Sequence, residues 1–123
     1  MSGTVIETGE GVTGYAPGDR VVVESVVYDD SCYACRQHAP GLCHQRVFVG
    51  YTGYGGGFAH YICAQPKSIH KLPDSISMEV GALIEPLAVA WHGVKVSQIK
   101  QGQSALIIGG GESPLTLELP EAS

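Results

Sequence analysis

The sequence predicts a mainly β fold that ends in an α/β tail. Glycine supplies 17 of the 123 residues, about twice its average usage of roughly 7%, and this excess indicates frequent turns. Residues 21–28 are rich in valine, which is typical of a strand. From Ser77 onward, helix signals are followed by a short apolar run and a glycine turn, which predicts the α/β tail.

Four strands are expected in the first part of the chain, at 4–8, 21–28, 58–64 and 69–72. The turn Pro17-Gly18-Asp19 leads into the second strand, and residues 29–57 form a long excursion loop before the third. Cys63 lies on the third strand, where the expected role is that of a small buried core residue.

Helical features begin at Ser77, whose hydroxyl can accept a hydrogen bond from a free backbone N–H at a helix start. Pro86 suits the beginning of a second helix. Residues 86–97 are apolar on nearly every side, which predicts a buried helix with Trp91 in the core. Residues 104–108 are expected to form a last buried strand.

Charge and hydropathy exclude some classes of partner. The formal net charge is −5, so the chain lacks the basic footprint of a nucleic-acid-binding protein. No apolar run approaches the roughly 20 residues of a membrane span. Residues 1–15 have neither a basic start nor an apolar stretch, so no signal peptide is expected and a cytoplasmic location follows by default.

The excursion loop carries three of the four cysteines, Cys32, Cys35 and Cys43. Two thiolates separated by two residues can bind one metal ion from a single turn, and a third can join them from the far side of the loop. Zinc prefers four ligands, and Asp29 is placed to supply a carboxylate oxygen. Competing donors are Asp30, His38 and His44. The expected role is structural, because a loop with little apolar content needs a cross-link.

Three other interpretations of the cysteines stay open. Cys32 and Cys35 have the spacing of a redox pair, although the βαβ context of thioredoxin-like motifs is missing. The cysteines can also be unrelated to one another. Alternatively, the loop is a former metal site that lost its full ligand set and no longer binds an ion.

Several segments resemble one family in the right order and at the right spacing. The family is that of the zinc-dependent medium-chain alcohol dehydrogenases, whose motifs resemble Gly11–Val21, Gly55–Tyr61 and Ser104–Gly111. Two further segments, Lys71–Asp74 and Gly81–His92, are similar to its polyol and butanediol dehydrogenase branch. The family's structural-zinc lobe has the pattern Cys-x-x-Cys-x-x-Cys-x7-Cys. Here Asp29 replaces its first cysteine, so the resemblance implies Asp29, Cys32, Cys35 and Cys43 as ligands of a structural zinc.

The resemblance implies a partial GroES-like β-barrel catalytic domain over residues 1–97 and the start of a Rossmann domain for NAD(P), with its first strand, over 98–123. Members of the family transfer hydride between a small alcohol, polyol or ketone and NAD(P). A catalytic zinc polarises the substrate oxygen. They are often homo-oligomers.

Two departures lead us to expect a fragment without activity of its own. The usual catalytic-zinc ligands lie upstream of the position of Gly3, and only Glu85 remains at a family position near that metal. A lone carboxylate cannot hold zinc, so the favoured interpretation of Glu85 is a buried carboxylate hydrogen-bonded to backbone donors at a helix start. Gly109 and Gly111 match the dinucleotide-binding glycine turn, but Pro114 occupies its third glycine position, so this chain is not expected to bind NAD(P) by itself.

Two further hypotheses accompany the dehydrogenase fragment. One is a non-catalytic, zinc-stapled module or interaction protein from a truncated gene, which binds metal but no NAD. The other is a chain that does not fold stably, because incomplete barrel strands and apolar helix faces would be exposed.

Overall fold

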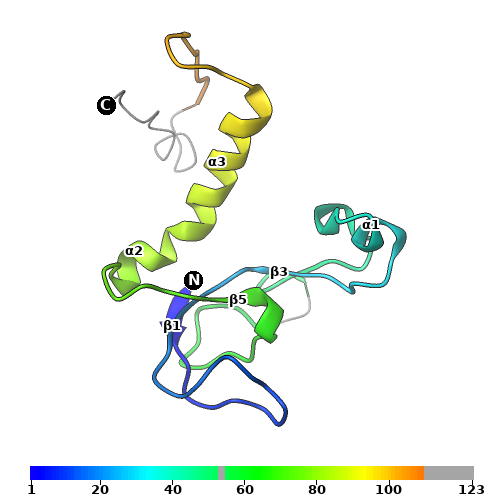
Figure 1. Ribbon diagram of the computed structural model, residues 1–123, viewed down its shortest axis with the longest axis vertical. Coiled ribbons are helices and arrows are strands. Elements are labelled where there is room, and N and C mark those ends of the chain that lie inside the picture. Colours follow the sequence, from blue (N-terminus) through cyan, green and yellow to red (C-terminus); the bar gives the residue numbers. More distant parts are fainter. Residues whose placement is uncertain (53–54, 110–123) are drawn as a thin grey trace. The chain divides into compact units, whose positions relative to one another are not determined.

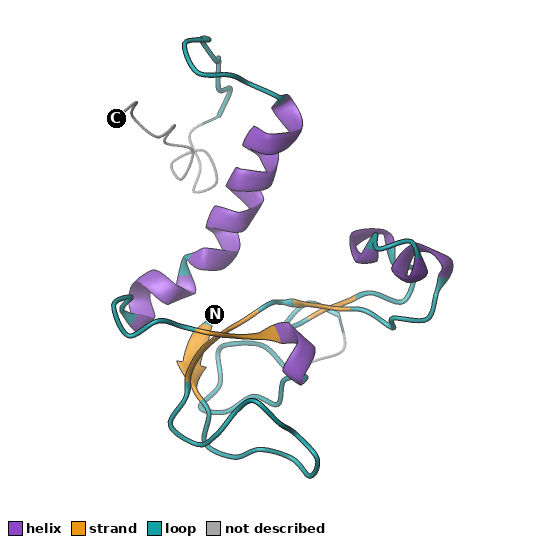
Figure 2. Cartoon of the chain, in the orientation of Figure 1, coloured by secondary structure: helices purple, strands orange, loops and turns teal. Residues whose placement is uncertain are grey.

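The computed structural model describes residues 1–52 and 55–109 (Figure 1). The chain forms two compact units, Met1–Ala82 and Leu83–Ser123. The first unit holds all the described strands, and the second begins with a long helix (Figure 2). Gly111 and Pro114, on which the expected cofactor turn depends, lie outside the described residues.

The core of the first unit is a three-stranded antiparallel sheet in the order β1-β2-β5. Its strands are β1 (Ser2–Thr4), β2 (Arg20–Val23) and β5 (Ile69–Lys71). In the central strand, Val22 pairs with Ser2 on one side and with His70 on the other. All three valines of β2 are buried. The valine-rich run therefore forms the centre of the sheet, as its β-branched composition predicts.

The predicted strand at 21–28 is divided into two. After β2, the backbone N–H of Glu24 donates to the carbonyl of Ser68, and the chain then leaves the sheet. The second half, β3 (Val26–Val27), pairs instead with β4 (Val47–Phe48) in a separate antiparallel ladder. This two-residue ladder closes the base of the excursion loop.

Two other strand predictions are wrong in place or in kind. The first strand covers Ser2–Thr4 rather than 4–8, because Val5 turns to hydrogen-bond with Asp19 and Gly18 outside the ladder. Residues 58–64 form no strand, and Phe58 is fully exposed. A β-rich run needs a neighbouring strand, and none pairs with it in the part of the chain that the structure describes.

The β5 strand confirms the prediction at 69–72 apart from its last residue. It follows the short 3-10 helix η2 (Pro66–Ser68). Leu72, which directly follows β5, is buried and completes the small core. The helix α2 (Met78–Ala82) begins after Ser77, whose hydroxyl accepts from the backbone N–H of Val80 at 3.3 Å, so Ser77 caps the helix as expected.

The second unit contains α3 (Ile84–Ser97). It begins two residues before Pro86, which is tolerated there because a first-turn N–H needs no helical partner. The predicted burial is wrong: Ala90 is the one buried residue of α3, and Trp91 is 63% exposed. Apolar composition drives burial only where another element packs against it, and no strand forms at 104–108 to do so.

Among the described helices, none combines the length and the apolar character needed to cross a bilayer.

Candidate metal centre

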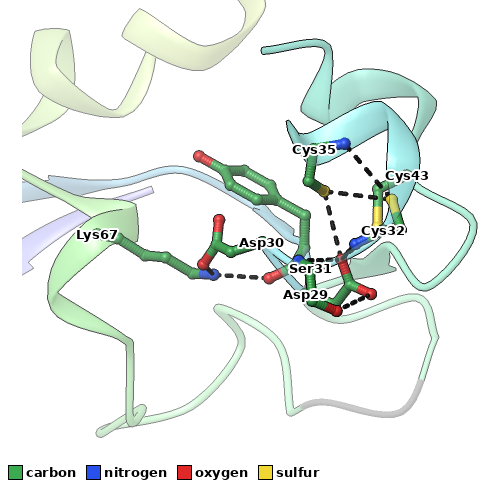
Figure 3. A network of polar contacts seen from close by, with 8 residues as sticks. Asp29, Asp30, Ser31, Cys32, Cys35, Cys43 and Lys67 are labelled. Carbon is green, nitrogen blue, oxygen red and sulfur yellow. Dashed lines mark hydrogen bonds and ion pairs between the residues drawn. The ribbon is translucent and has the colours of Figure 1, made fainter. Parts of the chain in front are cut away.

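The metal-donor residues lie in a lobe between β3 and β4, formed by α1 (Tyr33–Arg36) and the 3-10 helix η1 (Pro40–Leu42). Cys32 is the N-cap of α1, and its Sγ accepts from the backbone N–H of Cys35 at 3.5 Å. Cys43 follows η1 and is fully buried. The two turns therefore bring three sulfur atoms to one place (Figure 3).

Asp29 faces the same place because backbone donors fix its carboxylate. Its Oδ1 atom accepts hydrogen bonds from the N–H of Ser31 at 3.0 Å and from the N–H of Cys32 at 3.1 Å. Its Oδ2 atom accepts from the Ser31 hydroxyl at 3.1 Å. Aspartate favours this local turn through its short side chain. One oxygen consequently points toward the sulfur atoms without any further rearrangement (Figure 3).

The spacing of the donor atoms suits a tetrahedral zinc ion. The Sγ atoms of Cys32 and Cys35 are 3.5 Å apart, and Asp29 Oδ1 lies 3.3 Å from Cys35 Sγ. Cys43 Sγ lies 3.6 Å from the same oxygen, and all four donor atoms fall within 4.8 Å of one another. With zinc–sulfur bonds of about 2.3 Å and zinc–oxygen bonds of about 2.1 Å, the edges of the tetrahedron are about 3.6–3.8 Å. The donor set therefore fits zinc in both distance and chemistry.

Protonation in the metal-free lobe follows the hydrogen bonds. The N–H of Cys32, followed by Ser31, holds the pKa of Asp29 well below its usual range. Burial, followed by contacts with Cys32 and Asp29, raises the pKa of Cys35 to about 12. The N–H of Cys35 lowers the pKa of the Cys32 thiol. Asp29 is thus an ionised acceptor, and the Cys35 thiol donates its proton to it.

The donor group contains Asp29 rather than the competing donors Asp30, His38 and His44. The cysteines are free thiols, and the 3.5 Å between Cys32 and Cys35 exceeds the roughly 2.05 Å of a disulfide. Within residues 1–52 and 55–109, this is the one group of at least three potential metal donors with such spacing.

The remaining candidate residues lie apart from this cluster. Glu85 is exposed in the first turn of α3, so the expectation that it is a buried carboxylate is wrong. Gly109 has a φ of 110°, in the region that favours glycine, and Gly111 lies outside the described residues. Cys63 is exposed rather than buried, because the strand expected around it does not form.

Sequence reasoning missed Lys67, which contacts the lobe from η2. Its Nζ atom donates to the carbonyl of Tyr28 at 2.6 Å and forms an ion pair with Asp30. These contacts join residues 37 or more positions apart, and neither spacing nor periodicity indicates them. The contacts of Lys67 exist only in the folded chain, where η2 lies beside the start of the lobe.

The sheet and the lobe together form a β-rich unit that carries a group of four potential metal donors. Residues 1–74 match the model of the alcohol dehydrogenase GroES-like domain. The chain therefore belongs to the GroES-like alcohol dehydrogenase family, which confirms the resemblance read from its motifs.

Individual relatives agree with this assignment. The chain is 44% identical over 122 residues to (R,R)-butanediol dehydrogenase of Bacillus subtilis, covering 99% of this chain and 34% of that protein. It is 38% identical to (R,R)-butanediol dehydrogenase of Saccharomyces cerevisiae, with 90% and 33% covered. The chain thus spans about a third of the length of the curated relatives that it matches.

Solved structures give the same result. The crystal structure of 2R,3R-butanediol dehydrogenase from B. subtilis matches with a TM-score of 0.85 and 43% identity, covering 94% of this chain and 32% of that one. A Sinorhizobium meliloti protein assigned as a zinc-binding dehydrogenase, solved with NADP bound, matches with a TM-score of 0.89 and 34% identity, covering 94% and 34%. Both solved structures therefore share the fold of this chain over 94% of its length.

Proposed function

We propose that this chain is part of a zinc-dependent NAD(P) alcohol or polyol dehydrogenase, and that residues 29–43 hold its structural zinc. The observation that carries the proposal is the group of four donor atoms within 4.8 Å, on a chain that belongs to the family. In this proposal residues 1–97 are part of the catalytic domain. Residues 98–123 begin the NAD(P)-binding domain.

The proposed ligands of the zinc are Asp29, Cys32, Cys35 and Cys43. Four protein donors complete a tetrahedral shell, whereas a catalytic zinc keeps one position for water or substrate. The ion would therefore supply folding free energy to the lobe rather than Lewis-acid chemistry. This role suits the lobe, in which Cys43 is the one buried residue of the four.

Hydride transfer belongs to the proposal for the whole protein. The butanediol dehydrogenase relatives favour a small alcohol, polyol or ketone as substrate. In the described part of this chain, Glu85 belongs to no group of three or more potential metal donors. We therefore expect no turnover from the 123-residue chain alone, even when its lobe is loaded with zinc.

A second candidate is a non-catalytic, zinc-stapled module. It is favoured by the same closed donor group, because a structural zinc needs no substrate cleft. This candidate predicts zinc binding without cofactor binding. The free state of the cysteines suits a reducing compartment for either candidate, so a cytoplasmic location is part of the proposal.

Native mass spectrometry tests the metal site. The purified chain should carry one zinc ion, and Cys32→Ser should lose it. Cys63→Ser is the matched control, because Cys63 is exposed and lies outside the donor group. A wild-type chain that binds no zinc in the presence of excess ion would refute the proposed site.

Cofactor binding then tests the module, which a positive result would exclude. Nicotinamide fluorescence is titrated with the zinc-loaded chain, and retention on cofactor resin provides a second readout. Saturable binding favours the dehydrogenase proposal and defeats the module. Zinc binding with no cofactor binding by this chain fits either candidate, because in the dehydrogenase proposal residues 98–123 only begin the NAD(P)-binding domain.

A further inference from the structure

We propose that Lys67 is a positioning residue of the metal centre, which holds the residues on both sides of Asp29. This inference deepens the proposed zinc site and rests on it. The ammonium of Lys67 donates to the carbonyl of Tyr28 at 2.6 Å. It also pairs with the carboxylate of Asp30 (Figure 3). It also lies 4.7 Å from the centre of the Tyr28 ring, within cation–π range.

A contact of this kind would stabilise the lobe, because the ladder of β3 and β4 at its start and end is short. β3 and β4 pair over two residues each, and a two-stranded ladder of this size is marginal in water. The backbone N–H of Val49 adds one hydrogen bond to the carbonyl of Ser25 at 2.8 Å. Lys67 supplies a contact from outside this ladder, at the point where the chain enters the metal loop.

The backbone of Lys67 is held in place by its neighbours in the chain. Its helix η2 starts at Pro66, and the neighbouring Ser68 is 2% exposed. The carbonyl of Ser68 accepts from the N–H of Glu24 at 2.8 Å, and β5 follows directly in the main sheet. Lys67 thus connects the sheet to the lobe, with a side chain that is 31% exposed.

The backbone at Asp30 explains why this turn benefits from an anchor. Its φ is 61°, a left-handed conformation that aspartate tolerates and most residues avoid. The turn directs Asp29 Oδ1 toward Cys35 and Cys43. Contacts that fix Tyr28 and Asp30 therefore restrict where the intervening carboxylate can point.

Electrostatics favour the same role. A site in which three thiolates and one carboxylate bind a zinc ion has a net negative charge. The Lys67 ammonium balances the charge of Asp30, so this second carboxylate beside Asp29 adds no unpaired negative charge to the loop. Groups that orient metal ligands from outside the ligand shell commonly change metal affinity by about 10- to 100-fold when they are removed.

The test compares zinc affinities by competition with a chromophoric chelator, using the full 123-residue chain. Lys67→Met keeps the aliphatic stem and removes the charge, Lys67→Arg keeps a donor that can reach both oxygens, and Asp30→Asn removes the paired charge. We expect Lys67→Met to weaken zinc binding by about tenfold, near the lower end of that range because the ion pair is partly exposed. Lys67→Arg should restore most of the affinity.

A control variant and a double variant test whether the loss of zinc affinity comes from the contact between Lys67 and Asp30. Lys95→Met changes the same residue type on α3 and should leave zinc affinity unchanged. Lys67→Met combined with Asp30→Asn should lose less affinity than the product of the two single losses, because both disrupt one contact. With saturating Co²⁺, the ligand-field bands of Lys67→Met should shift, whereas a purely global loss of stability would leave them unaltered.

Amide hydrogen exchange adds a measurement that does not need zinc. In the metal-free chain, the amides of Ser31 and Cys32 donate to Asp29, so Lys67→Met should make their exchange faster. Unchanged exchange together with unchanged zinc affinity would overturn the role of Lys67. If the wild-type chain bound no zinc, the proposed metal centre would fail first, and with it any positioning role toward the metal. Faster exchange in Lys67→Met would then show only a structural anchor.

Discussion

Asp29 Oδ1 accepts a hydrogen bond from the Sγ of Cys35 at 3.3 Å, although the two residues lie on different turns of the lobe. The same oxygen accepts from the backbone N–H groups of Ser31 and Cys32. The carboxylate therefore has a fixed position, with Oδ1 close to the sulfur atoms. Replacing a thiolate by this carboxylate keeps four donors at the site and makes one of them harder.

The first prediction separates two roles of Asp29, as a hydrogen-bond acceptor in the local turn and as a zinc ligand. An asparagine at this position would retain a side-chain oxygen for the local turn but lose the charge, so Asp29→Asn should weaken zinc binding on the order of a hundredfold. Asp29→Cys should strengthen it, because a fourth soft ligand replaces the carboxylate. Chelator competition measures both changes. Equal affinities for the wild-type chain and Asp29→Asn would exclude Asp29 from the ligand set.

The second prediction concerns pH. With its pKa raised to about 12, the Cys35 thiol is protonated at neutral pH in the metal-free chain and must release its proton when zinc binds. Asp29, whose pKa is lowered, is already ionised. Zinc affinity should therefore fall as pH decreases from about 8 to about 6, through the thiols alone. Calorimetry in buffers of different ionisation enthalpy measures the protons released, and zero release would contradict this protonation scheme.

Acid should also weaken the metal-free lobe through Asp29. A carboxyl whose pKa is lower in the folded chain stabilises folding above its ordinary value of 3.8. That contribution is lost as pH falls below this value and approaches the lowered pKa. The local exchange of the Ser31 and Cys32 amides, corrected for intrinsic rates, follows the loss. A protection that stays constant below pH 3.8 would show that the carboxylate does not hold the turn.

The third prediction addresses the core. Val22 is 8% exposed in the central strand, so Val22→Ala should lower the free energy of unfolding of the first unit by about 1–3 kcal/mol. Val80→Ala is the matched control, because Val80 is 51% exposed on α2. Its effect should stay within about 0.5 kcal/mol. Urea denaturation of both variants supplies the comparison, and similar losses would contradict the assigned core.

Some of these features could be predicted from the sequence because their causes are local. The valine-rich β2, the Ser77 cap and the four metal donors follow from residue type and short spacing. The break between β2 and β3 depends on the distant Ser68, and Lys67 meets Asp30 only in the folded chain. Long-range contacts of this kind leave no periodic pattern in the sequence.

The burial predicted for the apolar helix α3 is wrong for a different reason. Its composition predicted burial, yet Leu87, Val89 and Trp91 are 40%, 57% and 63% exposed. Composition indicates what a helix prefers to contact, whereas burial depends on whether another element packs against it. The same reason explains why the β-rich run at 58–64 forms no strand: its ladder partner is missing from the described residues.

The fourth prediction follows from this exposure. The sequence contains one tryptophan, so intrinsic tryptophan fluorescence reports on Trp91 alone. Its emission should have the long wavelength of a water-exposed indole, and acrylamide should quench it efficiently. A short-wavelength emission protected from acrylamide would show that the apolar face of α3 is covered.

X-ray absorption at the zinc edge of the wild-type chain tests the proposed metal centre most directly. The account predicts about three sulfur neighbours at roughly 2.3 Å and one oxygen at roughly 2.0–2.2 Å, changing to four sulfurs in Asp29→Cys. A wild-type shell dominated by oxygen or nitrogen, or an unchanged sulfur number in Asp29→Cys, would contradict the ligand set of Asp29, Cys32, Cys35 and Cys43.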